Sequence, residues 1–347
     1  MIKTNLFGIM PDSKKEIIKF TVSNNNGMEV SFINFGAIIT SIVVPDKNGN
    51  PGDIVLGFDK FEKYLTNPPY FGAVIGRVAN RISKGSFILN GKKINVTQNG
   101  DGFQLHGGEK GFDKKYWEAV PFEREGLQGV KFSYLSKDGE EGYPGNLHVT
   151  VKYLLTGNNE LIIEYQASSD NDTVINLTNH TYFNLKGEGK EEVYNHILKI
   201  NSDKYLLLSK ETLVPTGDIV SVHNTAYDFT IPQTIGKRID TIPPGYDICY
   251  VLDGDKNSGT PIAEVFEPTT GRFLQAFTNQ PAFQLYTGNY LEGIKGKNNH
   301  EYINHSAFCI ETQDFPDAPN HPAFPSILLK KGEIYHRTTK FKFGIKN

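Results

Sequence analysis

Glu311 and His180 combine the residue types and surroundings that acid–base chemistry requires. Glu311 follows the apolar run 307–310, so it is expected at the end of a buried strand. An unpaired carboxylate there is costly unless it has a partner or a task. His180 lies in the polar and aromatic segment NLTNHTYFNL, residues 176–185. A carboxylate can accept a proton and an imidazole can donate one, so together they could catalyse a reaction that moves protons.

Both residues also have a purely structural interpretation. Glu311 could form an ion pair with a buried arginine, and His180 could be a core histidine that hydrogen-bonds to Asn176 or Thr178. For His180 taken alone the structural interpretation is the better one. For Glu311 the catalytic interpretation is favoured.

Two further segments bring basic side chains and glycines together. GRVANRI, residues 76–82, carries Arg77 and Arg81, which by themselves suggest a solvated face with an ion pair more than a binding site. FQLHGG, residues 103–108, places His106 before two glycines that could form a turn or let a ligand approach the backbone. The glycines around this histidine lack the G-x-x-x-x-G-K-[ST] pattern, so they do not predict phosphate binding.

Short alternating apolar segments, separated by Gly, Asn, Asp and Pro, recur along the whole chain and predict antiparallel strands. They are rich in the β-branched and aromatic residues that suit a pleated, half-buried surface. Examples are 28–44, which breaks at 34–36, 148–155, 161–167 and 197–209. Helical periodicity is nearly absent, and the stretch 58–65 is expected to form a short helix.

The 34 glycines and 18 prolines lie mainly between these segments as turn formers. Asn90-Gly91, Asp101-Gly102 and Asp138-Gly139 are typical of hairpins or tight turns. Because no linker, repeat or low-complexity tract divides the chain, a single domain over residues 1–347 is expected. The predicted fold is all-β: a large antiparallel β-sandwich with few short helices, whose sheets extend past the usual handful of strands.

Composition limits the classes of partner. The net charge is -3 and no Lys/Arg block forms a basic stripe, so neither nucleic acid nor an anionic membrane is an expected partner. The chain starts without a signal-like apolar stretch and has no run of roughly 18 apolar residues, which favours a cytoplasmic protein. Cys249 and Cys309 lack metal-type spacing and predict buried free thiols. A small neutral molecule or another protein is the expected partner.

The chain resembles the aldose 1-epimerase (galactose mutarotase) family in a series of motifs. Besides GRVANRI and NLTNHTYFNL, these are LGFD (56–59), LHGG (105–108), DGEEGYPG (138–145), QLYTGN (284–289) and SAFCIETQDFPDAPN (306–320). Their order and spacing cover nearly the whole chain. The resemblance implies a β-supersandwich fold and an isomerase of carbohydrate metabolism. Such an enzyme interconverts the α and β anomers of free hexoses such as galactose and glucose, without a cofactor or metal.

Carried over by motif, the resemblance implies that Glu311 is the catalytic base and His180 the catalytic acid. It also implies that the sugar is bound by Asn80, Arg81, His106, Asp247 and Gln284. One departure occurs in GYDICY, residues 245–250, where Ile248 stands in place of the polar residue, such as histidine, of many relatives. This difference bears on loop shape and substrate preference more than on activity.

The implied reaction opens a hemiacetal ring and recloses it on the other face, so it needs one base and one acid. With a reference pKa of about 4.3, Glu311 is expected to be ionised at neutral pH. A nearby carboxylate is expected to keep more of His180 protonated. His106 and Arg81 could donate to sugar oxygens, and Asp247 could accept from hydroxyls. Trp117 and some tyrosines could stack on the sugar, although core packing explains most aromatic residues.

Three other functions stay open at this stage. A non-catalytic sugar-binding protein could keep the pocket and lose turnover. A hexose-6-phosphate 1-epimerase would need an arginine cluster, and the motifs supply only Arg77 and Arg81. A glycoside hydrolase could use Asp247 and Glu311 as its two carboxylates. The preferred hexose, and whether the chain is a monomer or a homodimer, do not follow from the sequence.

Overall fold

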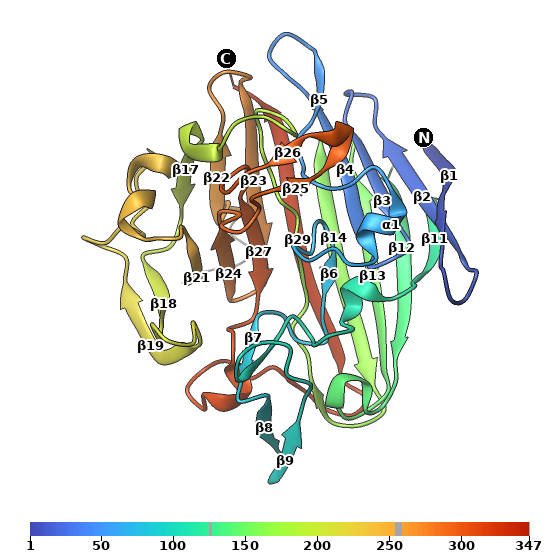
Figure 1. The fold of residues 1–347 in the computed structure, drawn as a ribbon, viewed down its shortest axis with the longest axis vertical. Coiled ribbons are helices and arrows are strands. Elements are labelled where there is room, and N and C mark those ends of the chain that lie inside the picture. Colours follow the sequence, from blue (N-terminus) through green and yellow to red (C-terminus); the bar gives the residue numbers. More distant parts are fainter. Residues whose placement is uncertain (125–126, 254–258, 347) are drawn as a thin grey trace.

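The computed structural model describes residues 1–124, 127–253 and 259–346. Strands make up nearly all of its regular structure, and they form one nine-stranded antiparallel sheet, two five-stranded antiparallel sheets and several two-stranded ribbons (Figure 1). The β1–β5 sheet lies on the right of Figure 1 and the sheet with β18 and β21 on the left. The predicted all-β antiparallel sandwich with few short helices is confirmed.

The nine-stranded sheet joins distant parts of the chain. In spatial order its strands are β11 (Glu118–Arg124), β12 (Leu127–Ser136), β13 (Leu147–Leu155), β14 (Glu160–Ser169), β29 (Ile334–Ile345), β23 (Arg272–Thr278), β22 (Ala263–Phe266), β17 (Ile197–Ile200) and β20 (Gln233–Thr234). Near the end of the chain, β29 pairs with β14 on one side and β23 on the other. The sheet is therefore completed only when the last strand is in place.

The two five-stranded sheets differ in connectivity. One is a meander of β1 (Ile2–Ile9), β2 (Glu16–Ser23), β3 (Glu29–Ile33), β4 (Ile38–Pro45) and β5 (Pro51–Asp53). The other has the spatial order β19 (Pro215–Ser221), β18 (Lys204–Leu208), β21 (Asp247–Val251), β24 (Ala282–Tyr286) and β27 (Cys309–Gln313). The second sheet is the one that matters for chemistry, because Glu311 lies on β27.

Short elements connect these sheets. The ribbons are β6 (Val74–Ile75) with β16 (Thr178–Asn179), β7 (Arg81–Ser83) with β10 (Phe103–Leu105), β8 (Ser86–Leu89) with β9 (Lys92–Asn95), β15 (Thr173–Val174) with β28 (Leu328–Leu329), and β25 (Ile294–Lys295) with β26 (Glu301–Tyr302). One α-helical turn, α1 (Phe61–Tyr64), falls inside the predicted helical stretch 58–65. The 3₁₀ turns are η1 (Phe112–Lys114), η2 (Glu140–Gly142), η3 (Val193–Asn195), η4 (Ile235–Lys237), η5 (Ile239–Thr241), η6 (Lys297–Asn299) and η7 (Ala318–Asn320).

The main core forms because strands alternate their side chains between two faces. Along β14 every second residue is buried. The buried face of the large sheet packs against the buried faces of the two smaller sheets in one continuous apolar cluster. Within this cluster the rings of Phe32 on β3 and Tyr153 on β13 stack with centroids 4.6 Å apart. Burying each large apolar side chain contributes about 1.5–3 kcal/mol, so this cluster dominates stability.

Most local predictions agree with the structure. The run 28–44 forms β3 and β4 with its break where expected, and Asn90-Gly91 forms the two-residue turn between β8 and β9, with both φ angles positive. The run 197–209 is not one strand, because it divides at 201–203 into β17 and β18, which belong to different sheets. Asn201 and Ser202 hydrogen-bond to loop and strand carbonyls there, and this polar pairing ends β17.

Arg77 is not on a solvated face, contrary to the interpretation that the sequence favoured. Its side chain is 2% exposed. The guanidinium donates to the carbonyls of Pro144 and Gly145 at 2.8 and 3.1 Å, and to the hydroxyl of Ser136 at 2.6 Å. It also reaches the Thr173 hydroxyl at 3.2 Å. Burial lowers the pKa of this guanidinium to about 10. Arg77 thus ties the DGEEGYPG segment to the large sheet.

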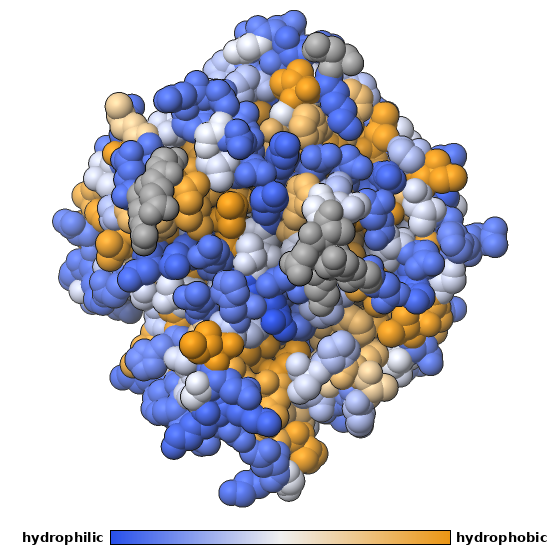
Figure 2. Space-filling model, turned by 180° about the vertical axis from the view of Figure 1, so that it is seen from behind, coloured by the Kyte–Doolittle hydropathy of each residue, from blue (hydrophilic) through white to orange (hydrophobic). Residues whose placement is uncertain are grey.

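The surface offers polar side chains over most of the face seen in Figure 2, where apolar residues occur in separate groups between hydrophilic ones. The most exposed large apolar side chains are Ile334, Ile231, Tyr290 and Met1. Within the described part of the chain, no helix has the length and apolar character needed to cross a membrane.

We expect Arg77→Met to lower the free energy of unfolding by at least about 3 kcal/mol, because several buried acceptors lose a charged donor at once. Denaturant titration followed by fluorescence and circular dichroism measures the change. Lys92→Met is the control, since Lys92 is exposed on β9 and its loss should cost less than about 0.5 kcal/mol. Equal effects of the two substitutions would contradict a supporting role for Arg77.

Candidate active site

Three neighbouring strands, β21, β24 and β27, present one polar face. Gln284 on β24 lies directly opposite Glu311 on β27 and opposite Cys249 on β21. Directly opposed residues point to the same face of a sheet, and so do residues two apart on one strand. Asp247, two residues before Cys249, therefore joins Gln284 and Glu311 on this face. The Gln284 amide donates to the Asp247 carboxylate at 2.6 Å.

The opposite face of the same strands belongs to the core. Ile248, Phe283 and Ile310 are all buried in the main apolar cluster. Ile248 is thus a strand residue that points away from Asp247, and not part of a loop. The expected influence of Ile248 on loop shape is wrong, because alternation along β21 directs its side chain into the core.

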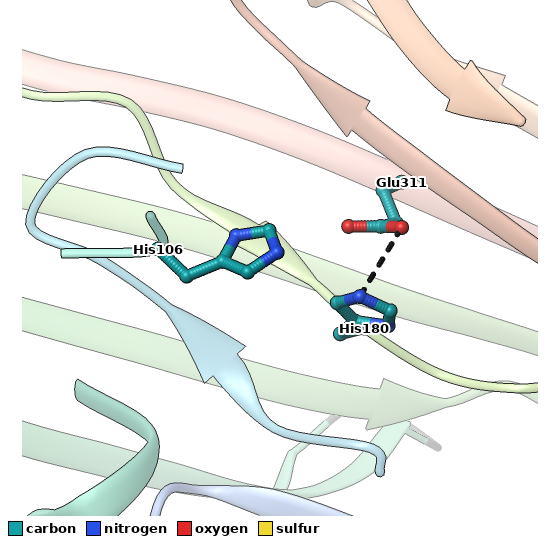
Figure 3. Close-up of side chains that lie close together, drawn as sticks. All are labelled: His106, His180 and Glu311. Atoms are coloured by element: carbon teal, nitrogen blue, oxygen red, sulfur yellow. Dashed lines mark ion pairs between the residues drawn. The ribbon is translucent and has the colours of Figure 1, made fainter. Parts of the chain in front are cut away.

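His180 reaches the polar face of β27 from a separate segment. It follows β16, and its backbone N–H donates to the carbonyl of Ala73 at 2.9 Å. The Nε2 atom of His180 lies 3.5 Å from Oε1 of Glu311, and Figure 3 shows the two side chains directed toward each other. His180 and Glu311 are 4% and 3% exposed. The side chain that contacts the Glu311 carboxyl group is therefore His180 and not a buried arginine.

Asn80, Arg81 and His106 are placed by the β7–β10 ribbon, in which Arg81 pairs with Leu105. The backbone N–H of His106 donates to the Asn80 carbonyl at 2.9 Å, and the Asn80 N–H donates to Nδ1 of His106 at 3.2 Å. The Asn80 side chain also donates to Oε1 of Gln284 at 3.3 Å. Arg81 lies 4.0 Å from the carboxylate of Asp247. These bonds link the ribbon to the polar face of β21 and β24.

The turn after His106 depends on close backbone packing. Gly107 has φ +86°, and a Cβ there would lie 1.9 Å from the carbonyl oxygen of Gly76. At Gly108 a Cβ would lie 2.2 Å from Oε2 of Glu141. The close neighbours of both glycines are protein atoms, so their role is to let the chain pack and not to admit a ligand.

The predicted residues all line one cleft of about 380 Å³, a size suited to a small organic ligand. Its walls consist of Pro68, Pro69, Tyr70, Asn80, Arg81, Leu105, His106, His180, Tyr182, Asp247, Gln284, Tyr286, Tyr290, Ile294 and Glu311. The residues come from motifs that lie more than two hundred positions apart in the chain. The structure brings together every residue that the motifs nominated as catalytic or substrate-binding.

The cleft wall also contains tyrosines that were not among the predicted site residues. Tyr70 packs its ring against His106 and His180, with centroids 4.8 and 5.9 Å away, and Tyr182 stacks on His180 at 4.9 Å. Tyr182 and Tyr286 lie inside quoted motifs, whereas Tyr70 carries no signal beyond the two prolines before it. Trp117, considered as a stacking residue, is fully buried in the core and lies outside the cleft.

Several cleft residues adopt a left-handed backbone. Tyr70, Asn80 and His106 have φ angles of +60°, +60° and +52°. This region costs a residue with a side chain about 1–3 kcal/mol and recurs where function fixes the backbone. Its repeated occurrence around one cleft is consistent with a functional site.

Burial dominates the electrostatics of the carboxylates. It raises the pKa of Glu311 well above its usual value, and the negative charge of Asp247 raises it further while Arg81 opposes the shift. Burial likewise raises the pKa of Asp247, against the effects of Arg81 and the Gln284 amide. Glu311 is therefore a stronger base than an ordinary glutamate once it is ionised.

The two cleft histidines, His180 and His106, are neutral, so the imidazolium expected at His180 is wrong. Burial lowers the pKa of His180 to about 3, partly offset by its own backbone carbonyl. Burial also lowers the pKa of His106 well below its usual value, and the nearby His180, Arg81 and Lys114 act in the same direction. The resemblance predicted a carboxylate near His180 and the apolar run predicted burial of Glu311, but nothing in the sequence indicated that His180 is also almost completely removed from water.

The cluster of His106, His180 and Glu311 has ligand atoms within 4.8 Å of one another, close enough for one metal ion to bridge (Figure 3). At His106, however, Nδ1 accepts the Asn80 N–H, so the ring proton lies on Nε2. A protonated nitrogen cannot coordinate a metal. In this state His106 offers an N–H donor, which suits a ligand rich in oxygen acceptors.

The similarity of this chain to known proteins extends over nearly its whole length. A family model described as aldose 1-epimerase matches residues 19–342. Galactose mutarotases of Bos taurus and Homo sapiens are 46% and 45% identical over 342 residues, which cover 98% of this chain and 98% of each relative. The solved structure of an aldose epimerase homologue from C. elegans matches with a TM-score of 0.88 and 30% identity, covering 95% of this chain and 99% of that one.

The cleft electrostatics predict opposite effects from two substitutions on the pKa of Glu311. Asp247→Asn should lower this pKa because it removes a negative charge, and Arg81→Gln should raise it because it removes a positive charge. Carboxyl ¹³C NMR titration of protein labelled at glutamate measures both, with Glu311→Gln to assign the signal. Shifts in the same direction, or a Glu311 that titrates like a free carboxyl in the unsubstituted protein, would refute this account.

Proposed function

Since the chain belongs to the aldose 1-epimerase family, its function is that of an aldose 1-epimerase, and we propose that Glu311 and His180 perform the proton transfers of that reaction. The observation that carries the proposal is the meeting of the two side chains, 3.5 Å apart, in a cleft lined by hydrogen-bonding groups. We infer that the substrate is a free hexose, with galactose supported by the names of the relatives and glucose as a second substrate.

In the proposed ring opening, the Glu311 carboxylate accepts the proton of the anomeric hydroxyl. The O–H electrons form the C1 carbonyl, the bond between C1 and the ring oxygen breaks, and Nε2–H of His180 donates its proton to that oxygen. Rotation about the C1–C2 bond then presents the other carbonyl face. Ring closure reverses both transfers, so each residue returns to its starting state and the sugar leaves as the other anomer.

Burial suits both groups to these roles. A base is most effective when its pKa lies near the working pH, and the raised pKa of Glu311 moves it in that direction. His180 works as a neutral imidazole, which can act as an electrophile when burial prevents the charged form. Glu311 and His180 therefore share the reaction without a resident positive charge on the imidazole.

We propose that the remaining polar groups hold the ring while its anomeric end reacts. Nε2–H of His106 and the Arg81 guanidinium can donate to sugar oxygens, and Asp247 can accept from hydroxyls. Asn80 and Gln284 hydrogen-bond to each other, and Gln284 also orients Asp247. They complete the set of substrate-binding residues inferred from the motifs.

The positions of the two arginines in GRVANRI argue against a hexose-6-phosphate 1-epimerase. Arg81 lines the cleft, but Arg77 does not, and its buried guanidinium donates to the carbonyls of Pro144 and Gly145. A phosphate site would need further bidentate donors beside Arg81. A neutral hexose fits the cleft better.

We also infer that residues 1–347 act as a single domain, supported by a large sheet whose strands come from residue 118 to residue 345. A cytoplasmic location is supported by the two cysteines, which are both free and buried.

Polarimetry of freshly dissolved α-D-galactose and α-D-glucose tests the proposed roles. We expect Glu311→Gln and His180→Asn each to lower the catalysed rate by about 10²- to 10⁴-fold, because each removes one proton-transfer group. Matched controls are Glu164→Gln and His148→Asn on the large sheet, outside the cleft, which should retain activity.

Other outcomes would point to other functions. If the folded protein left the spontaneous rates of both sugars unchanged, a sugar-binding role or a sugar-phosphate substrate would replace the proposal. If His180→Asn kept turnover while Glu311→Gln and Asp247→Asn both lost it, a two-carboxylate hydrolase would become the better account.

A further inference from the structure

The His180 ring is held between two side chains of the same strand. Cys309 and Glu311 are two residues apart on β27, so they point to the same face. Sγ of Cys309 lies 3.6 Å from Nδ1 of His180, and Oε1 of Glu311 lies 3.5 Å from Nε2. The proposed reaction uses Nε2 alone. The contact at Nδ1 therefore needs a separate explanation.

Two arrangements of protons fit the contact at Nδ1: the thiol can donate to a bare Nδ1, or an Nδ1–H can donate to the sulfur, which is a weak acceptor. A neutral imidazole has one nitrogen that donates and one that accepts. Cys309 is fully buried, and burial together with the charges of Glu311 and Asp247 raises its pKa well above the usual value, so the thiol keeps its proton. The backbone carbonyl of His180 accepts the Gly72 N–H at 2.9 Å and also acts on the ring, raising its pKa. Oε1 of Glu311 faces Nε2 at 3.5 Å and, when the carboxylate is ionised, can only accept, so it favours a ring proton on Nε2. Nδ1 is then the acceptor for the thiol proton.

We propose that Cys309 is a positioning residue for the epimerase reaction: its S–H donates to Nδ1 of His180 and keeps the ring proton on Nε2, toward Glu311 and the cleft. This inference rests on the proposed role of His180 as the acid. It assigns to Cys309 a function beyond that of a small buried hydrophobe.

The identity of the group at Nδ1 affects how readily Nε2–H gives up its proton. A carboxylate or carbonyl at Nδ1 would favour a proton on Nδ1 and leave a bare Nε2 facing the sugar. A donor does the reverse, because it stabilises the lone pair on Nδ1 as negative charge develops on the ring. The thiol therefore both selects the productive tautomer and strengthens a neutral imidazole as an acid.

His106 supports the same logic by independent means. Its Nδ1 accepts the backbone N–H of Asn80 at 3.2 Å, which also places the ring proton on Nε2. A backbone amide performs at His106 the task that the thiol performs at His180. Both imidazoles then offer N–H donors to the oxygen atoms of a sugar.

Two-bond ¹H–¹⁵N correlation spectra of histidine-labelled protein report the tautomer directly. We expect the unsubstituted protein at neutral pH to show His180 with its proton on Nε2, assigned by loss of the signal in His180→Asn. Cys309→Ala and Cys309→Val remove the donor, the second with little loss of packing volume. Both should give His180 a substantial population of the Nδ1–H form. Cys249→Ala is the control, because that equally buried thiol contacts Gln313 and should leave the His180 tautomer unchanged.

Kinetics give a second readout. Cys309→Ala and Cys309→Val should lower kcat by about three- to tenfold, the scale of one weak hydrogen bond. KM should stay unchanged because Cys309 does not line the cleft. An unsubstituted His180 with its proton on Nδ1, or variants that keep the Nε2–H form, would overturn the proposal even if kcat or thermal stability fell.

The tautomer is measurable without turnover. Failure of Glu311→Gln and His180→Asn to affect the polarimetric rate would remove the proposed function and leave the His180–Cys309 hydrogen bond to be judged on its spectrum. The two proposals can therefore fail separately.

Discussion

The site depends on one constraint: an ionisable pair must be kept away from water without losing its hydrogen-bonding geometry. Glu311 and His180 are nearly fully buried, and burial alone moves the pKa of each in the direction that favours the neutral form. The cost of such burial falls on stability. The three neighbouring strands β21, β24 and β27, called the platform below, offset this loss of stability because their opposite face is part of the main apolar cluster.

The remaining architecture serves to bring loops to that platform. β24 is central, since it hydrogen-bonds to β21 on one side and β27 on the other. The β7–β10 ribbon supplies Arg81 and His106. Its turn requires glycine at position 107 because the carbonyl oxygen of Gly76 occupies the space that a side chain would need. Beneath this turn, Glu141 accepts the backbone N–H groups of Glu109 and Lys110. The DGEEGYPG motif is thus a support for the His106 loop, anchored in turn by Arg77.

The sequence predicts the strands and the residues that meet in the cleft, for different reasons. β3, β4, β13 and β14 follow from alternation because one face of each strand is buried. The site residues follow from motifs, since residues so distant in the chain leave no local signal of their proximity. Neither the alternation of apolar residues nor the motifs predict two features of the structure. The division of 197–209 between two sheets depends on tertiary pairing. The position of Tyr70 over the histidines depends on a loop with a left-handed backbone.

The protonation states could not be predicted from residue types, and they change the chemistry. A carboxylate beside an imidazole in water favours the imidazolium, which was the expectation for His180. In the folded chain, desolvation opposes every charged form in the cleft, and Asp247 adds repulsion to Glu311 rather than an attraction to His180. A neutral ring can be an acid only if its single proton lies on the reacting nitrogen. It follows that the partner of the non-reacting nitrogen is as important as the base, and a buried thiol is a partner that donates without bringing a charge.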